Sequence, residues 1–170
     1  YACGITVSGE AHIGHAYQAI VYDLFRKFLQ KQGYEVTYAR NYTDVDDKII
    51  ARAKEANVPA DEYAAEMIGN INAVMRRAEI DEPDLWLKAT DNIKNIVSFI
   101  EELVEKGHAY PAGNGDVYFD VDSYPAYGQL SGRSADESLD GVRVENDTAK
   151  KNAYDFALWK AAKEGEICWE

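Results

Sequence analysis

The spacing of hydrophobic and polar positions near the start of the chain predicts a strand, a helix and a second strand. Residues 1–7 are mostly apolar and are expected to form a short buried strand, with residues 8–10 (Ser-Gly-Glu) as the turn after it. Residues 14–31 carry apolar side chains at helical spacing, and Gly33 is placed to end this helix. Residues 34–40 alternate and are partly β-branched, so they predict the second strand. The apolar face expected on the helix consists of Ile20, Val21, Leu24, Phe25, Phe28 and Leu29.

A strand, a helix and a strand in this order form a βαβ unit, whose two strands lie parallel in one sheet. Sheets of this kind bind ligands outside the carboxyl ends of their strands. His12 lies in the loop after the first predicted strand, and Thr43 lies in the loop after the second. We therefore expect both residues at the same edge of a parallel α/β sheet.

The middle of the chain is predicted to be helical. Either Asp44 or Asp46 can cap a helix that runs to about Asn57. Two further helices are expected at about 59–80 and 91–106. The apolar face of the last helix consists of Ile93, Ile96, Val97, Ile100, Leu103 and Val104.

A β-hairpin and a loop-rich segment are expected to follow. The Asn-Gly pair at 114–115 is a strong turn signal between the strand-like residues 109–110 and 117–119. Residues 122–149 are polar and rich in Ser, Gly and Asp, which favours loops. A short helix is expected at residues 153–162.

The composition is that of a globular protein: 46% of the 170 residues are hydrophobic, which is enough for one core. The formal net charge is −12, and the basic residues are scattered. Since clustered Lys and Arg hold phosphate backbones, a simple nucleic-acid binder is disfavoured. Cys3 and Cys168 are too few for a disulfide framework and fit a reducing cytoplasm, and no apolar run reaches membrane-spanning length. The first residue already lies in a strand-like segment, and the last residues do not resemble the end of a domain. We therefore expect the chain to be a piece of a longer protein.

His12-Ile13-Gly14-His15 stands at the start of the first predicted helix and carries the clearest chemical signal. A helix N-terminus presents unpaired N–H groups and a positive dipole end, both of which attract anions. Gly14 lacks the side chain that would keep a nucleotide away from the backbone. The two imidazoles could donate to phosphate oxygens as negative charge builds in a transition state. Polar residues that only begin a helix are the alternative interpretation, because a four-residue string alone is weak evidence.

Several strings resemble cysteinyl-tRNA synthetases in order and spacing. The most specific are Cys3-Gly4-Ile5-Thr6-Val7 and Thr43-Asp44-Val45-Asp46-Asp47-Lys48, which flank the histidine pair. Further strings extend the resemblance over nearly the whole chain: residues 106–110, 114–121, 127–133 and 155–160.

The resemblance implies a class I synthetase with a Rossmann-like α/β fold. Residues 1–57 would be the first half of its nucleotide-binding domain, and 58–107 a helical continuation. Residues 108–170 would be a connective insertion that ends before the second half of the fold. The implied cytoplasmic enzyme uses ATP to activate L-cysteine as cysteinyl adenylate, transfers it to tRNA(Cys), and has no membrane partner. Most tRNA contacts and a lysine-rich loop would lie outside this chain, so we expect the chain alone to show little or no activation.

The resemblance also assigns roles around the nucleotide. His12 and His15 would act on the transferring phosphate, and Gly14 would join them in binding ATP, which Mg²⁺ accompanies. Asp46 and Asp47 are better explained as acids at a helix start than as catalytic or magnesium carboxylates.

Four more residues match the family's amino-acid pocket or its metal. Gly4, Thr6 and Thr43 match positions around bound cysteine, although β-propensity or turn chemistry would also explain the threonines. Cys3 matches a ligand of Zn²⁺, and the other ligands would lie beyond Glu170. A thiolate–zinc contact separates cysteine from serine, which pocket shape alone does poorly. The alternative for the chain's own thiol is a small buried hydrophobe.

Two departures from the family pattern leave other functions open. Ser8-Gly9 stands where relatives usually have Tyr-Asp, and Ala16-Tyr17-Gln18 stands where many have a small residue, Arg and then Thr or Ser. One alternative is a mycothiol-type cysteine ligase, which transfers cysteine to an amino sugar. The other is a non-catalytic paralogue that binds nucleotide or a protein partner.

Overall fold

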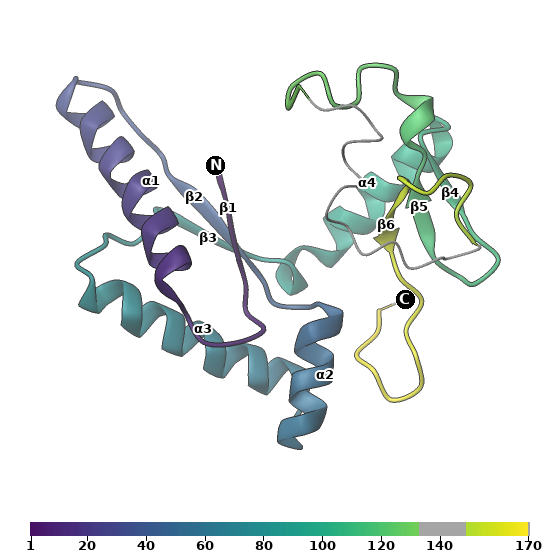
Figure 1. Ribbon diagram of the computed structural model, residues 1–170, viewed down its shortest axis with the longest axis horizontal. Helices are drawn as coiled ribbons and strands as arrows, with labels where there is room; N and C mark the ends of the chain where they lie inside the picture. The colour runs from purple at the N-terminus through teal and green to yellow at the C-terminus, as the bar shows by residue number, and fades with distance from the viewer. Residues whose placement is uncertain (133–148, 170) are drawn as a thin grey trace. The chain divides into compact units, whose positions relative to one another are not determined.

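The computed structural model describes residues 1–132 and 149–169 and divides the chain into two compact units, Tyr1–Ile93 and Lys94–Glu170 (Figure 1). The first unit contains a parallel sheet, and the second contains an antiparallel one. The expected Rossmann-like α/β fold with a hairpin-containing segment is confirmed. No helix of the described residues has both the length and the apolar character needed to cross a membrane.

Strands and helices follow one another in the first unit as a βαβ pattern predicts. Helix α2 and helix α3 both precede the third strand, so the second crossover is longer than the first. A short 3₁₀ turn at Thr90–Asn92 ends the unit. In chain order the elements are β1 (Ala2–Thr6), α1 (Ile13–Lys31), β2 (Ala39–Thr43), α2 (Asp47–Ala56), α3 (Ala60–Arg77) and β3 (Leu85–Lys88).

The sheet has the order β1-β2-β3, and both neighbouring pairs are parallel. Thr6 lies opposite Thr43, and Ala39 lies opposite Leu85. The predicted parallel βαβ unit is therefore confirmed. The analysis of hydrophobic spacing missed β3, because its four residues are too few to show a clear alternation.

The second strand lies further along the chain than predicted. Residues 34–38 precede the ladder, and β2 runs from Ala39 to Thr43. Tyr38 is bound to Asp84: its N–H donates to the carboxylate at 2.7 Å, and its carbonyl accepts from the Asp84 N–H at 2.8 Å. Alternation along one segment shows extended backbone but does not show where pairing with a neighbour begins.

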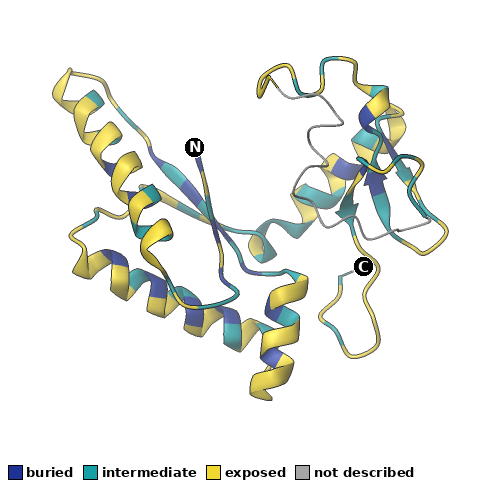
Figure 2. Cartoon of the chain, viewed as in Figure 1, coloured by how far each residue is buried: buried dark blue, intermediate teal, exposed yellow. Residues whose placement is uncertain are grey.

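The core of the first unit lies on the face of the sheet that the helices cover (Figure 2). Tyr42 is 3% exposed, its ring stacks on Trp86 with centroids 4.1 Å apart, and its hydroxyl donates to Asn72 at 2.5 Å. Burial raises the pKa of Tyr42 to about 12, so the hydroxyl stays a donor. The buried cluster consists of Ile5, Val7, Ala19, Tyr42, Ile49, Ala64, Met67, Ile71 and Met75.

The apolar face predicted for α1 is largely uncovered. The helix itself is confirmed, and Gly33 follows it with φ +91°. Leu24, Phe25 and Phe28 are 61%, 57% and 57% exposed, and Ala19 and Asp23 are the buried positions of the helix. Helical spacing identifies an apolar face correctly, but burial requires a second surface, and the described residues supply none at these positions.

The two acids after β2 have separate roles. Asp46 is the N-cap of α2, and its carboxylate accepts from the Lys48 N–H at 2.9 Å. Asp44 is buried, and it accepts from the Thr90 N–H at 3.0 Å and from the Thr90 hydroxyl at 2.5 Å. Asp44 therefore ties the end of β2 to the turn after β3, and Asp46 begins helix α2.

The second unit consists of a helix and a small antiparallel sheet with the strand order β4-β5-β6. The predicted helix and hairpin are confirmed, and Gly115 takes a positive φ of +91° in the hairpin loop. The elements are α4 (Ile93–Glu105), β4 (Ala109–Pro111), β5 (Val117–Phe119), a 3₁₀ turn at Val121–Ser123 and β6 (Phe156–Trp159).

The short helix predicted at residues 153–162 is wrong: this segment forms β6, which pairs with β5. Phe156 stacks on Phe119 with ring centroids 5.2 Å apart, so a cross-strand contact outweighs the helical spacing of the segment. The predicted loop at residues 122–149 falls mainly on 133–148, which lie outside the described residues.

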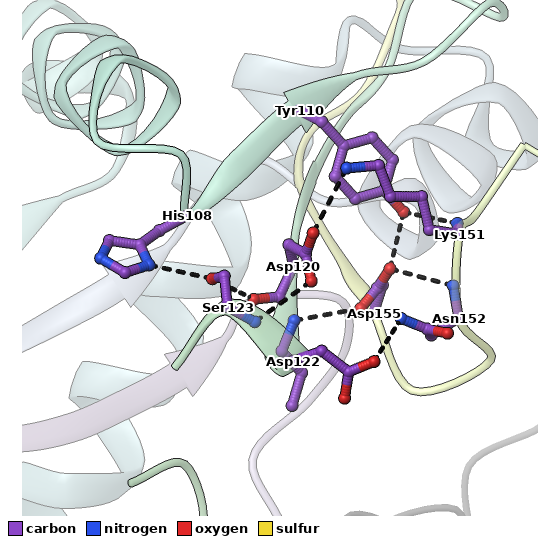
Figure 3. A network of polar contacts seen from close by, with 9 residues as sticks. His108, Tyr110, Asp120, Asp122, Ser123, Lys151, Asn152 and Asp155 are labelled. Atoms are coloured by element: carbon purple, nitrogen blue, oxygen red, sulfur yellow. Dashed lines mark hydrogen bonds and ion pairs between the residues drawn. The ribbon is translucent and has the colours of Figure 1, made fainter. Parts of the chain in front are cut away.

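A buried carboxylate joins β6 to the hairpin (Figure 3). Asp155 is 2% exposed, and it accepts from the Tyr110 hydroxyl at 2.7 Å and from the N–H groups of Val121 and Asn152, each at 3.1 Å. These donors compensate for the loss of water around the charge. Nearby, the Nδ1 of His108 lies 2.9 Å from the Ser123 hydroxyl.

Candidate functional site

The loop after β1 places a histidine pair at the first turn of α1. His12 is the N-cap, and its Nδ1 accepts from the Gly14 N–H at 3.1 Å. Its own N–H donates to the Nδ1 of His15 at 3.4 Å, which completes a capping box. The two rings stack with their centroids 3.7 Å apart. The rings therefore hold each other in place at the end of the helix that attracts anions.

The hydrogen bonds of the pair determine which ring nitrogens can donate. Since both Nδ1 atoms accept, each ring in its neutral form carries its proton on Nε2. Burial, then the neighbouring His12 and Arg40, lower the pKa of His15 from its ordinary value of 6.5. A neutral His15 keeps its Nε2–H for a ligand. The arrangement can offer two N–H donors to phosphate oxygens.

Gly14 has a packing role in addition to the one expected from the sequence. A Cβ at this position would lie 3.0 Å from Cε1 and 3.1 Å from Nδ1 of His12, so the glycine lets the ring lie close to the helix. The Gly14 N–H is bound to that ring, and the N–H groups of His15 and Ala16 donate to the His12 carbonyl at 2.9 and 3.2 Å. More of the anion-binding capacity at this helix end therefore belongs to the rings than to the backbone.

The carboxyl ends of β1 and β2 lie side by side. Thr6 pairs with Thr43, and the Val7 N–H donates to the Thr43 carbonyl at 3.2 Å. Thr6 is exposed and Thr43 half-buried. The loop that carries His12 leaves from the same edge, so these residues belong to one corner of the first unit, as the topology predicted.

Cys3 and Gly4 lie within β1, opposite the middle of β2. Cys3 is exposed and free, so it is not the small buried hydrophobe of the alternative interpretation. Gly4 faces the backbone of β2 at very short range: a Cβ there would lie 1.5 Å from the carbonyl oxygen of Asn41. Only glycine allows this approach.

Two residues of this corner were not identified from the sequence. The side-chain oxygen of Asn41 accepts from the Gly4 N–H at 2.8 Å. Arg40 is 3% exposed, and its Nη2 donates to Gln18 at 2.9 Å. A signal existed for Arg40, since a charged side chain stands within the predicted strand, where its burial has to be compensated, whereas Asn41 lies just beyond the predicted end of that strand.

The described residues do not form a metal site by themselves. Among them, no three His, Cys, Asp or Glu side chains gather closely enough to hold a metal ion. Cys3 fits the chemistry of a single zinc ligand, and nothing in the described part of the chain supplies the others.

A family model described as the catalytic domain of tRNA synthetases class I (C) matches residues 1–170. This match agrees with the parallel sheet and with the histidine pair after its first strand. The chain belongs to this family of class I tRNA synthetases.

The curated relatives narrow the assignment within the class. Over its whole length, this chain is 48%, 47% and 48% identical to the cysteine–tRNA ligases of Trichlorobacter lovleyi, Neisseria meningitidis serogroup A and Petrotoga mobilis, respectively. The chain covers 35%, 24% and 36% of their lengths, so it spans about a third or less of these proteins. It corresponds to an N-terminal catalytic part of a cysteinyl-tRNA synthetase.

Proposed function

We propose that this chain is the part of a cytoplasmic cysteinyl-tRNA synthetase that gathers ATP and cysteine for activation. The single observation that carries the proposal is the stacked, capped histidine pair at the start of α1, in a chain that matches the synthetase family along its whole length. The cysteine carboxylate attacks the α-phosphorus of ATP, the bond to the β-phosphate bridging oxygen breaks, and cysteinyl adenylate and pyrophosphate form. The cysteinyl group then passes to a ribose hydroxyl of tRNA(Cys).

The nucleotide side of this reaction is assigned to the start of α1. The Nε2–H groups of His12 and His15 donate to phosphate oxygens whose charge grows in the transition state. Gly14 allows the first ring to lie close to the helix, and Mg²⁺ accompanies the triphosphate. A neutral His15 matters because it donates without needing an additional proton.

The amino-acid side is assigned to the adjoining strand ends. Gly4, Thr6 and Thr43 would line the cysteine pocket, and Cys3 would provide one ligand of a zinc ion whose other ligands come from outside this chain. When bound, the metal would supply selectivity for a thiol over a hydroxyl. With a net charge of −12, most of the tRNA contact is assigned to other parts of the enzyme.

The proposal is tested by ATP–pyrophosphate exchange in the full-length synthetase that carries this chain. His12→Ala and His15→Ala should each lower kcat about 100-fold or more, as removal of a transition-state donor does. His108→Ala is the matched control, since this histidine lies in the second unit and contacts Ser123; it should stay within about twofold of the native enzyme. A kcat for exchange that stays at the native value in both His12→Ala and His15→Ala would contradict the proposal.

The acceptor is tested separately, because the departures at Ser8-Gly9 and Tyr17-Gln18 flank this corner. Product analysis should show cysteinyl-tRNA when the enzyme is given tRNA(Cys) and no cysteinyl product when it is given an amino sugar. The reverse result would identify the amino-sugar ligase. Absence of ATP binding by calorimetry in the full-length protein would favour a non-catalytic paralogue that binds a protein partner.

A further inference from the structure

Strand β1 contains one residue more than β2 near the start of their parallel ladder. From Ala2 to Ile5, β1 advances three residues, while β2 advances two, from Arg40 to Tyr42. An extra residue of this kind bends a strand and redirects the side chains at the bulge.

This bulge decides which way Cys3 faces. In a regular strand, residues two apart share a face. Ile5 and Val7 are 4% and 0% exposed, so regular alternation would place Cys3 on the same buried face. In the structure, Ala2 lies on the buried face instead and is 4% exposed, whereas Cys3 is exposed.

The side chain of Asn41 holds the bulge from the neighbouring strand. Its Oδ1 accepts from the Gly4 N–H at 2.8 Å and from the Tyr1 hydroxyl at 2.9 Å. Its Nδ2 lies 3.4 Å from the hydroxyl oxygen of Thr43, a long hydrogen bond. An amide is suited to this position because it accepts and donates at once.

We propose that Asn41 is the positioning residue of the cysteine pocket: it fixes the bulge that keeps Cys3 out of the core and sets Gly4 and Thr43 relative to each other. The structural part of this inference is independent of the activity. The part that concerns the pocket rests on the proposed function.

The structural part is tested by the alkylation rates of the two thiols in the 170-residue chain. Cys168 is also exposed and free, so it is the internal reference. Asn41→Ala should lower the ratio of the Cys3 rate to the Cys168 rate at least about fivefold, as the strand returns to regular alternation and takes the thiol into the core. Tyr1→Phe is the matched control, since it removes only the second donor to Oδ1; its ratio should stay within about twofold.

Hydrogen exchange at the Gly4 amide covers the case in which Asn41→Ala does not fold. Asn41→Asp keeps the accepting oxygen and should leave the exchange rate of this amide within about threefold of the native chain, whereas Asn41→Ala, if folded, should raise it at least about tenfold. Loss of protection in Asn41→Asp, or an unchanged thiol ratio in a folded Asn41→Ala, would overturn the inference.

The pocket part is tested by exchange kinetics in the full-length synthetase. Asn41→Ala should raise the KM for cysteine at least about tenfold, with the KM for ATP and kcat within about threefold, because the nucleotide site is not touched. A merely structural role would move all three values together, and that result would overturn the positioning role. A native enzyme that does not use cysteine would instead overturn the proposed function and leave the thiol and amide results standing.

Discussion

At the scale of single residues, the candidate site depends on how closely two backbones can approach. Gly4→Ala would bring a Cβ to 1.5 Å from the Asn41 carbonyl oxygen, so β1 would have to move away from β2. We expect a loss of about 3 kcal/mol or more in unfolding free energy, measured by urea denaturation.

The matched control for this substitution is Gly69→Ala. Gly69 lies within α3, and a Cβ there meets no atom within 4 Å. Because alanine is the better helix former, the control should be unchanged or stabilised by up to about 1 kcal/mol. Equal losses in the two variants would contradict the role of close approach at Gly4.

His15 should also give the stability of the chain a pH dependence. Its pKa is lowered in the folded state by burial and then by His12 and Arg40, so the unfolded chain binds a proton more readily. The stabilising contribution is therefore present above the ordinary pKa of 6.5 and is lost as the pH falls below it.

Melting temperatures at pH 8 and pH 5.5 measure this effect. The native chain should lose more stability over this interval than His15→Gln, which cannot take up the proton. Identical pH profiles for the two proteins would show that His15 does not titrate differently in the folded state.

At the scale of elements, a single buried carboxylate connects β6 to the hairpin. Asp155→Ala would leave the Tyr110 hydroxyl and the Val121 N–H without their acceptor. We expect the unfolding free energy of the second unit to fall by about 2–4 kcal/mol, measured by amide exchange at Tyr118, the buried residue of β5.

Asp122→Ala provides the comparison for the carboxylate. Asp122 is exposed and accepts from Asn152 and the Tyr154 hydroxyl at the surface of the same network. Its loss should cost less than about 1 kcal/mol, because water can replace the acceptor. A comparable loss from both variants would show that burial does not set the value of the Asp155 contacts.

The elements that sequence analysis identified are those with strong local signals. Helix α1 has a long apolar repeat, Asp46 caps α2, and the Asn-Gly turn marks the β4–β5 hairpin. The elements that it missed or misplaced depend on a partner far along the chain: β2 begins where β3 can pair with it, and β6 exists because β5 is its neighbour. The helical spacing of residues 153–162 could not reveal that β5 would pair with this segment.

At the scale of the whole molecule, the exposed apolar face of α1 and the small share of each relative that this chain covers both indicate that other parts of the enzyme contribute to its activity. Leu24, Phe25 and Phe28 are more than half exposed, and the chain covers 35% of the Trichlorobacter lovleyi protein. We expect the 170-residue chain alone to show no more than about 1% of the exchange rate of the full-length synthetase, because we propose that residues outside this chain contribute to transition-state stabilisation. Parallel ATP–pyrophosphate exchange assays measure this ratio, and a full rate from the chain alone would contradict it.

The sequence by itself determined the parallel α/β class, the histidine pair at a helix start and the placement of the ends of β1 and β2 at one edge of the sheet, because these follow from local periodicity, capping and topology. Tertiary structure alone decided the bulge in β1, the contact of Asn41 with Gly4, the exposure of Cys3 and the strand at residues 156–159. These features depend on the register between segments that are distant in the chain, and a register is set by the pairing of two surfaces rather than by either segment alone.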